Sequence, residues 1–301
     1  MKLRKIKLPK RKARDKEKVA ERRKKRLKYI AVIPSLITMM NGAFGFMAIV
    51  FASRSPDQRL DIFFAPEHTM TSFALSAYMI LLAMVADTLD GRIARLTRTT
   101  SSFGGQLDSL SDAISFGVAP AFLMLKLIQS NLVYLGYEDL TPTALISRLV
   151  IFAGIFYVMC TIVRLARFNV ENDEDIMSHM KFSGLPSPGA AGVVISLVIF
   201  HQQFMHGIQD RAIIYLTIIM LPLMTIFAGI LMVSRVMYPH LANQLLRSKK
   251  TLPSLLLIFA LGFFLIWNIQ ITLAVGFCGF ALFGFFRWMF SGLFKKKVVK
   301  A

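Results

Sequence analysis

Apolar runs close to 20 residues long recur along most of this chain, and they leave few folds open to it. A hydrocarbon core about 30 Å thick is crossed by roughly 20 residues of α-helix. Hydrophobic residues make up 55% of the 301 residues, and the mean hydropathy is +0.57, a more apolar balance than that of an ordinary soluble domain. These properties predict an all-α integral membrane protein.

Eight apolar segments can be placed on the sequence, and an even number of crossings puts both chain ends on the same side of the membrane. They cover residues 30–53, 71–90, 109–129, 145–168, 187–205, 211–233, 253–271 and 273–291. The gap between the last two segments is short, so these two could also form a single helical hairpin.

Positive charge is concentrated at the two ends of the chain, which has a formal net charge of +19. The positive-inside rule therefore predicts that both ends lie in the cytoplasm, with the bundle in the cytoplasmic (inner) membrane. For the basic head we favour contact with anionic lipid headgroups over nucleic acid, because an apolar helix follows it directly. Four regions result: a basic segment 1–28, a transmembrane core 29–233, a two-helix extension 234–293 and a basic tail 294–301.

Four aspartates lie where the second apolar segment ends and the third begins. Asp87 and Asp90 are three residues apart and Asp108 and Asp112 are four apart, so each pair occupies one face of a helix. If the two segments pack as neighbours, the pairs converge at the cytoplasmic end of the bundle. Taken alone, Asp87 and Asp90 could simply mark a helix end, and Asp108 and Asp112 could lie near a helix N-terminus because negative charge is stabilised there. The four together favour a functional site, since ionisable residues at membrane depth usually mark function.

Crowded carboxylates require positive charge, because neighbouring like charges cannot all stay ionised. Oxygen ligands without nearby His or Cys favour Mg²⁺, Ca²⁺ or Mn²⁺ over zinc, and two such ions can clamp a phosphate during displacement. Gly91, Ala94 and Gly104 leave room for a ligand, while Arg95 offers donors to phosphate oxygens. The sequence therefore predicts a phosphate or pyrophosphate ligand.

The stretch "DTLDGRIARLTRTTSSFGGQLDSLSD" resembles the signature of the CDP-alcohol phosphotransferases. All eight fixed positions of that signature are matched, namely Asp87, Asp90, Gly91, Ala94, Arg95, Gly104, Asp108 and Asp112. The resemblance implies a core of six transmembrane helices at about residues 30–233, with the last two segments as an extension. It further implies that the aspartates bind a pair of divalent ions, Mg²⁺ or Mn²⁺, which hold the CDP pyrophosphate. Asp112 would act as general base, and the protein would form a homodimer.

Three other stretches resemble sequences typical of the membrane-embedded phosphatidylserine synthases of this family: "IPSLITMMNGAFGF", "RLARFN" and "KFSGLPSPGAAG". The first departs from the usual pattern, which has Pro-Asn where this chain has Pro34 and Ser35, but it keeps Thr38 and Asn41. The resemblance implies transfer of the phosphatidyl group of CDP-diacylglycerol to L-serine. The same chemistry on glycerol phosphate, inositol phosphate or choline is the first alternative, and a non-catalytic lipid-binding or transport protein is a remote one.

Serine is a zwitterion, and a pocket that selects it should offer a cation to its carboxylate. Arg164 and Arg167 share a helix face and could bind that carboxylate or the lipid phosphate, and Lys181 is a further candidate. All three could instead anchor helix ends among lipid headgroups. "GLPSPGAAG" could serve as a rigid turn rather than contact a substrate. Asn41, which we assign to CDP binding, could equally hydrogen-bond a neighbouring helix.

Overall fold

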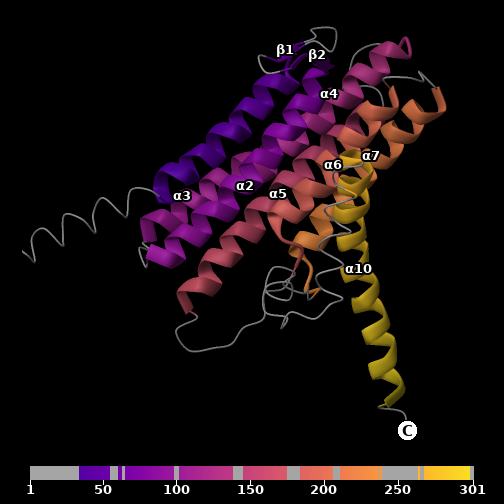
Figure 1. The fold of residues 1–301 in the computed structure, drawn as a ribbon. Helices are drawn as coiled ribbons and strands as arrows, with labels where there is room; N and C mark the ends of the chain where they lie inside the picture. Colours follow the sequence, from indigo (N-terminus) through magenta and orange to yellow (C-terminus); the bar gives the residue numbers. More distant parts are fainter. Residues whose placement is uncertain are drawn as a thin grey trace, which may run out of the picture.

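In the computed structural model the protein is a tilted bundle of long helices (Figure 1). The structure describes residues 34–54, 60–62, 65–97, 102–137, 145–174, 184–205, 211–236, 238, 264 and 268–298. The helices are Pro34–Ala52, α2 (Ser72–Thr97), α3 (Ser102–Asp112), the π-helix η1 (Ala113–Val118), α4 (Ala119–Tyr134), α5 (Leu145–Glu174), α6 (Ser187–Met205), α7 (Arg211–Val233) and α10 (Ile269–Val298). Long apolar segments form helices in a membrane because a helix satisfies its own backbone hydrogen bonds.

Six described helices are long and apolar enough to cross a membrane, which is consistent with an integral membrane protein. They are Pro34–Ala52, Ser72–Ala94, Phe103–Tyr134, Leu145–Val170, Arg211–Val233 and Ile269–Met289. The predicted count of eight crossings is not confirmed. Most of the predicted segment 253–271 lies outside the described residues, and the predicted segment 187–205 forms α6, which is not among these six helices.

The connection after the first helix contains a small hairpin that the sequence analysis did not predict. Strand β1 (Leu60–Ile62) pairs antiparallel with β2 (Ala65–Met70), with Leu60 opposite Met70 and Ile62 opposite Ala65. The hairpin lies beyond the end of the bundle at which α2 begins (Figure 1). It is therefore remote from the half of α2 that carries the aspartates.

The centre of the bundle is α6, which packs against α2, α4, α7 and α10. Its middle is made of fully buried β-branched residues, including Val193, Val194 and Ile195. The helix Pro34–Ala52 reaches α3 and η1 through glycines. A Cβ at Gly42 would meet the Ser111 hydroxyl at 3.3 Å, and one at Gly45 would run into Ser115. Small residues thus allow these two backbones to approach closely, as is typical of helix contacts in membranes.

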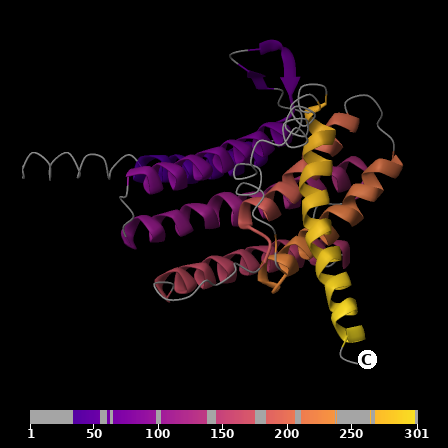
Figure 2. The same ribbon diagram turned by 60° about the horizontal axis from the view of Figure 1, so that its bottom comes forward.

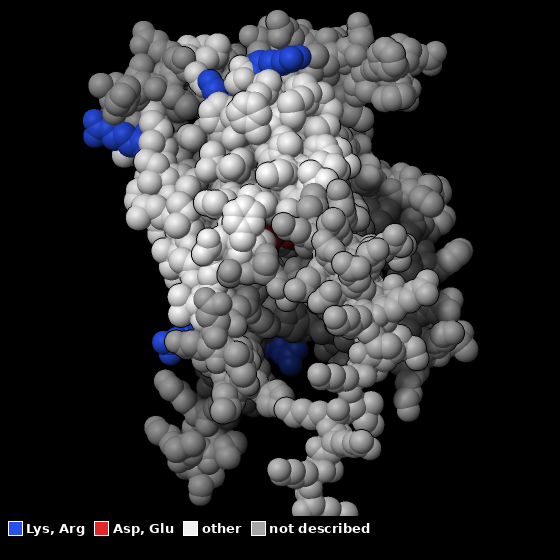
Figure 3. All heavy atoms as spheres, turned by 90° about the vertical axis from the view of Figure 1, so that its left-hand side faces the viewer, with Lys and Arg blue, Asp and Glu red and all other residues white. Residues whose placement is uncertain are grey.

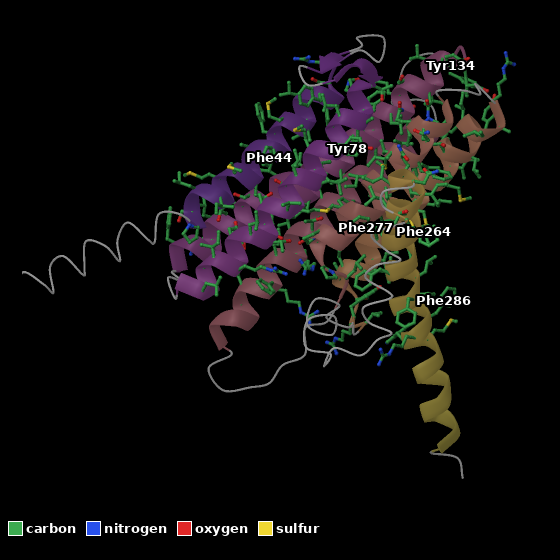
Figure 4. The ribbon with its side chains drawn as sticks, in the orientation of Figure 1. Phe44, Tyr78, Tyr134, Phe264, Phe277 and Phe286 are labelled. Carbon is green, nitrogen blue, oxygen red and sulfur yellow. The ribbon has the colours of Figure 1, made fainter. Side chains whose placement is uncertain are left out.

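The C-terminal helix α10 crosses the bundle obliquely and does not run along it (Figures 1 and 2). Its first half contacts α6, where the ring of Phe277 lies against Gly192 so closely that a Cβ there would clash with it. Figure 4 shows Phe277 at this crossing and Phe286 farther along α10, where the helix leaves the bundle. α10 begins earlier and ends later than the predicted segment 273–291.

Candidate active site

The first pair of aspartates lies within α2 and not at its end. The hydropathy pattern predicts Asp87 and Asp90 at the close of the helix, but α2 continues to Thr97. Asp90 is only 4% exposed, and Asp87 is partly buried. The helix continues because Arg92 to Thr97 contain no Pro or Gly that would end it. Both carboxylates are therefore held on a continuous helix, three residues apart on one face.

The second pair lies on α3, which begins earlier than predicted. Ser102 is its first residue, so Gly104 is helical, and fewer residues separate α2 from α3 than separate the predicted segments 71–90 and 109–129. Asp108 and Asp112 are consequently two and three turns into the helix, too far from its N-terminus to be explained by the helix dipole, whose effect falls off within the first turn. Asp112 is 7% exposed. The π-helix η1 follows it directly, and such π segments frequently occur at functional sites.

The two pairs converge, as the helical spacing predicted. One carboxylate oxygen from each of Asp87, Asp90 and Asp108 lies within 4.8 Å of the other two. Asp112 is not part of this trio, but it is near enough for the charges of Asp87 and Asp108 to act on it. Three aspartates thus form a cluster that could bind a metal ion, and the fourth stands beside it.

Asp112 is held by the first helix. The Asn41 amide Nδ2 donates a 2.9 Å hydrogen bond to Asp112 Oδ1, and the carbonyl of Asn41 accepts a 2.8 Å bond from the Ser115 hydroxyl. Asn41 is fully buried, and its side-chain Oδ1 has no hydrogen-bond partner. A buried polar atom without a partner is costly, so this oxygen could accept a hydrogen bond from a ligand.

A second unsatisfied atom lies in the aspartate cluster. Asp90 Oδ2 is buried without a hydrogen-bond partner, although Thr38 and the backbone of Gly91 interact with its carboxylate. Wherever the structure describes side chains, these four aspartates are the only acidic ones. Figure 3 shows an acidic group at the bottom of a recess on the face that it displays, so that group belongs to the cluster.

One arginine supplies positive charge to the cluster. Arg164 on α5 interacts electrostatically with Asp112 and Asp87, and its Nη1 donates a 2.6 Å hydrogen bond to the Ser187 hydroxyl at the start of α6. A single guanidinium does not balance four carboxylates. The oxygen-only ligand set, its charge and the orphaned Asp90 oxygen together fit a divalent cation such as Mg²⁺ or Mn²⁺.

The sequence profile of the CDP-alcohol phosphatidyltransferase family matches residues 31–237, more than half of the chain. The chain belongs to this family. A Helicobacter pylori protein named CDP-diacylglycerol–serine O-phosphatidyltransferase is 30% identical over 262 residues, which cover 86% of this chain and 92% of that protein. Proteins of the same name from Methanocaldococcus jannaschii and Saccharomyces cerevisiae are 31% identical over 219 residues (73% of this chain, 79% of that protein) and 34% identical over 166 residues (54% and 51%).

Among the small residues of the family motif, Gly91 borders open space. Gly91 is half-buried, and a Cβ added to it would meet no atom within 4 Å. Ala94 and Gly104 are likewise half-buried on α2 and α3. Arg95 lies on α2, but its side chain is outside the described residues. In this CDP-alcohol phosphatidyltransferase there is thus room beside Asp90 for a ligand to approach the helix.

The candidate acceptor residues differ in how the structure places them. Arg164 belongs to the site, as described above. Arg167 is half-buried one turn farther along α5, and Lys181 lies outside the described residues. In "GLPSPG" the first three residues lead into α6, which begins at Ser187. Gly184 has φ +98° and donates its backbone N–H to the Val236 carbonyl just beyond α7, a contact that fits the structural role offered for this stretch.

Sequence reasoning missed three polar residues around the site of this family member. Ser187 receives the Arg164 hydrogen bond, and Ser109 on α3 donates a 3.0 Å bond to Asn169 Oδ1 on α5. All three lie in stretches that the sequence analysis quoted, within or beside the family motifs. Their partners are on other helices, so helical periodicity alone could not identify them.

Proposed function

We propose that this protein is a phosphatidylserine synthase, which transfers the phosphatidyl group of CDP-diacylglycerol to L-serine and releases CMP. The observation that carries the proposal is the aspartate cluster between α2 and α3, with Arg164 beside it. Membership of the CDP-alcohol phosphatidyltransferase family supports the chemistry. The names of relatives at about 30% identity over most of the chain support serine as the acceptor.

We assign Asp87, Asp90, Asp108 and Asp112 as ligands of divalent ions, Mg²⁺ or Mn²⁺ and two in number. Bound ions would neutralise the carboxylates and draw electron density from the pyrophosphate of the donor. The open space beside Gly91 would receive the CDP moiety, with Ala94 and Gly104 allowing close approach. Arg95 would contact a phosphate, and Asn41 would donate to Asp112 while its free oxygen accepts from the nucleotide.

Asp112 would take the proton of the serine hydroxyl. The serine oxygen then bonds to the lipid-linked phosphorus while the bond from that phosphorus to the oxygen of CMP breaks, so CMP leaves with the bonding electrons. The Asn41 amide fixes one oxygen of Asp112 and leaves the other to face the substrate. A carboxylate near a metal is a weak base, so its orientation contributes more than its basicity.

Arg164 would bind the serine carboxylate. Only the Cα and Cβ atoms separate that carboxylate from the hydroxyl, so its cation must lie near the general base. Arg164 meets this requirement, because its charge acts on Asp112. Arg167 and Lys181 would add positive charge along the route of the acceptor or at the lipid phosphate.

An acceptor panel tests the function. Purified protein is given radiolabelled CDP-diacylglycerol and serine, glycerol phosphate, inositol, inositol phosphate or choline, with Mg²⁺, Mn²⁺ or EDTA. We expect metal-dependent CMP release with serine and formation of phosphatidylserine. Faster transfer to another acceptor would assign that alcohol instead, and no CMP release with any of them would leave a non-catalytic lipid-binding role.

We further propose that both termini and the active site face the cytoplasm and that the protein is a homodimer in the inner membrane. The basic ends of the chain support this orientation. Labelling of single cysteines introduced at residues 20 and 296 in intact and permeabilised cells tests the orientation. Light scattering in detergent tests the dimer, and a monomer mass would contradict it.

A further inference from the structure

Arg164 is oriented by a neutral partner. Its Nη1 donates to the hydroxyl of Ser187 at 2.6 Å, and Ser187 is fully buried at the first residue of α6. A guanidinium has five N–H donors in a rigid plane, so the bond to this hydroxyl restricts its orientation and leaves other donors for an anion. A carboxylate in the place of Ser187 would neutralise the charge that an anionic ligand needs.

Ser187 is in turn held by the turn that precedes it. Gly184 donates its backbone N–H to the Val236 carbonyl at 2.8 Å, and Leu185 donates to the Leu231 carbonyl at 2.9 Å. Gly184 has φ +98°, and a Cβ there would collide with the carbonyl of Met232, so only glycine fits. The start of α6 is therefore fixed to the C-terminal end of α7.

The chain just beyond α7 is fixed to α10. Tyr238, two residues after Val236, donates its hydroxyl to the Ala281 carbonyl at 3.0 Å. Its ring packs at 5.2 Å from that of Phe280 and lies against Gly284, where a Cβ would overlap it. Ala281 is fully buried, and Tyr238 is 9% exposed. These contacts leave little freedom to the segment that receives the Gly184 turn.

The family profile ends at residue 237, so Tyr238 and α10 lie outside the region that it matches. We propose that Ser187 is a positioning residue for Arg164, and that α10, through Tyr238, fixes the turn that precedes Ser187. The C-terminal helix thereby contributes to recognition of the acceptor without touching it. The role of Arg164 toward the serine carboxylate rests on the proposed function. The series of contacts from Ala281 through Tyr238, the Gly184 turn and Ser187 to Arg164 rests on the structure alone.

The first experiment compares Ser187→Ala with Ser196→Ala. Both serines are fully buried on α6, but Ser196 donates to the Val193 carbonyl of its own helix and interacts with Cys278 on α10 instead of with Arg164. We expect Ser187→Ala to raise the KM for serine by roughly tenfold, the usual weight of a hydrogen bond to a charged group. The kcat at saturating serine and the KM for CDP-diacylglycerol should change little, and Ser187→Thr should restore much of the loss. Ser196→Ala should behave like the wild type.

The second experiment perturbs the contact between Tyr238 and α10, which is the part of this series of contacts farthest from Arg164. Gly284→Ala places a methyl group against the Tyr238 ring, whereas Gly279→Ala on the same helix meets no atom within 4 Å. Tyr238→Phe removes only the hydroxyl bond to Ala281, and Tyr78→Phe on α2 is its control. We expect the KM for serine to rise by about twofold to fivefold in Gly284→Ala and Tyr238→Phe, less than in Ser187→Ala because the effect is transmitted through the turn.

The results of these experiments distinguish the proposed function, the role of Ser187 and the role of α10. A wild-type enzyme without serine-dependent CMP release overturns the proposed function and, with it, the acceptor assignment of Arg164. If serine is the acceptor but Ser187→Ala and Ser196→Ala have the same KM for serine, Ser187 is not a positioning residue. A rise in the KM for CDP-diacylglycerol instead of serine overturns the assignment to the acceptor. Equal values for Gly284→Ala and Gly279→Ala, with melting temperatures in detergent as the check on folding, remove α10 from the mechanism.

Discussion

Asn41 on the first helix donates its amide to Asp112 on α3 over 2.9 Å, although the two residues are 71 positions apart in the chain. Both are buried, and the glycines that follow Asn41 bring its helix against Ser111 and Ser115. A single hydrogen bond thus connects the packing of the first helix to the orientation of the proposed base.

We expect Asn41→Ala to lower kcat by about 100-fold, because a misplaced catalytic group commonly costs that much. Asn131→Ala is a matched control, since Asn131 is also a buried amide with a hydrogen bond to another helix, at His201. The control should lose stability but retain the kcat of the folded protein. Equal losses of kcat in the two variants would show that Asn41 contributes to packing and does not orient Asp112 for catalysis.

Asp112→Asn should fold normally and lose transfer. The amide has almost the same shape as the carboxylate but cannot accept the serine proton. CMP release from CDP-diacylglycerol with serine measures the effect, and the thermal unfolding temperature in detergent verifies the fold. Ordinary CMP release by the purified variant would remove the role of general base.

Asp90→Asn should stabilise the protein in EDTA and weaken its response to Mg²⁺. Without metal, Asp90 adds a buried negative charge next to Asp87 and Asp108. Neutralising it should raise the free energy of unfolding by about 1 kcal/mol or more, because like charges in an apolar pocket repel one another. Unfolding temperatures with and without Mg²⁺ measure this independently of activity. A wild type whose unfolding temperature does not respond to Mg²⁺ or Mn²⁺ would contradict a metal site here.

Gly45→Ala should destabilise the protein by about 1–3 kcal/mol, the usual cost of overpacking. Its Cβ would run into the backbone and side chain of Ser115, which cannot yield without separating the first helix from η1. Gly276→Ala on α10, where a Cβ meets no atom within 4 Å, serves as the control and should be close to neutral. Unfolding in increasing denaturant compares the two, and equal stabilities would show that the contact is loose.

Much of the site could be predicted from local pattern. The spacing of Asp87 with Asp90 and of Asp108 with Asp112 required only helical geometry, and the structure confirms that three of their carboxylates meet. The family prediction is also confirmed. The roles of these residues toward metal and substrate stay predictions.

The ends of the helices and the contacts between helices were predicted less well. α2 and α3 extend toward each other beyond the predicted bounds, because polar residues at a membrane surface continue a helix as readily as they end it. The π-helix after Asp112 has no signal in hydropathy. Its carbonyl at Phe116 accepts the Tyr157 hydroxyl at 2.9 Å, a contact across helices that stabilises the widened turn.

The amino-acid sequence by itself determined the class of this protein, its helical core and the pairing of the four aspartates on helix faces. Hydropathy and spacing along one helix are local properties, so they can be predicted without the fold. Only the tertiary structure decided that Asn41 holds Asp112, that Ser187 holds Arg164, and that α10 is joined to the same turn. These contacts join residues far apart in the chain. They depend on how closely helices approach, which the packing of glycines and rings sets and which no periodicity encodes.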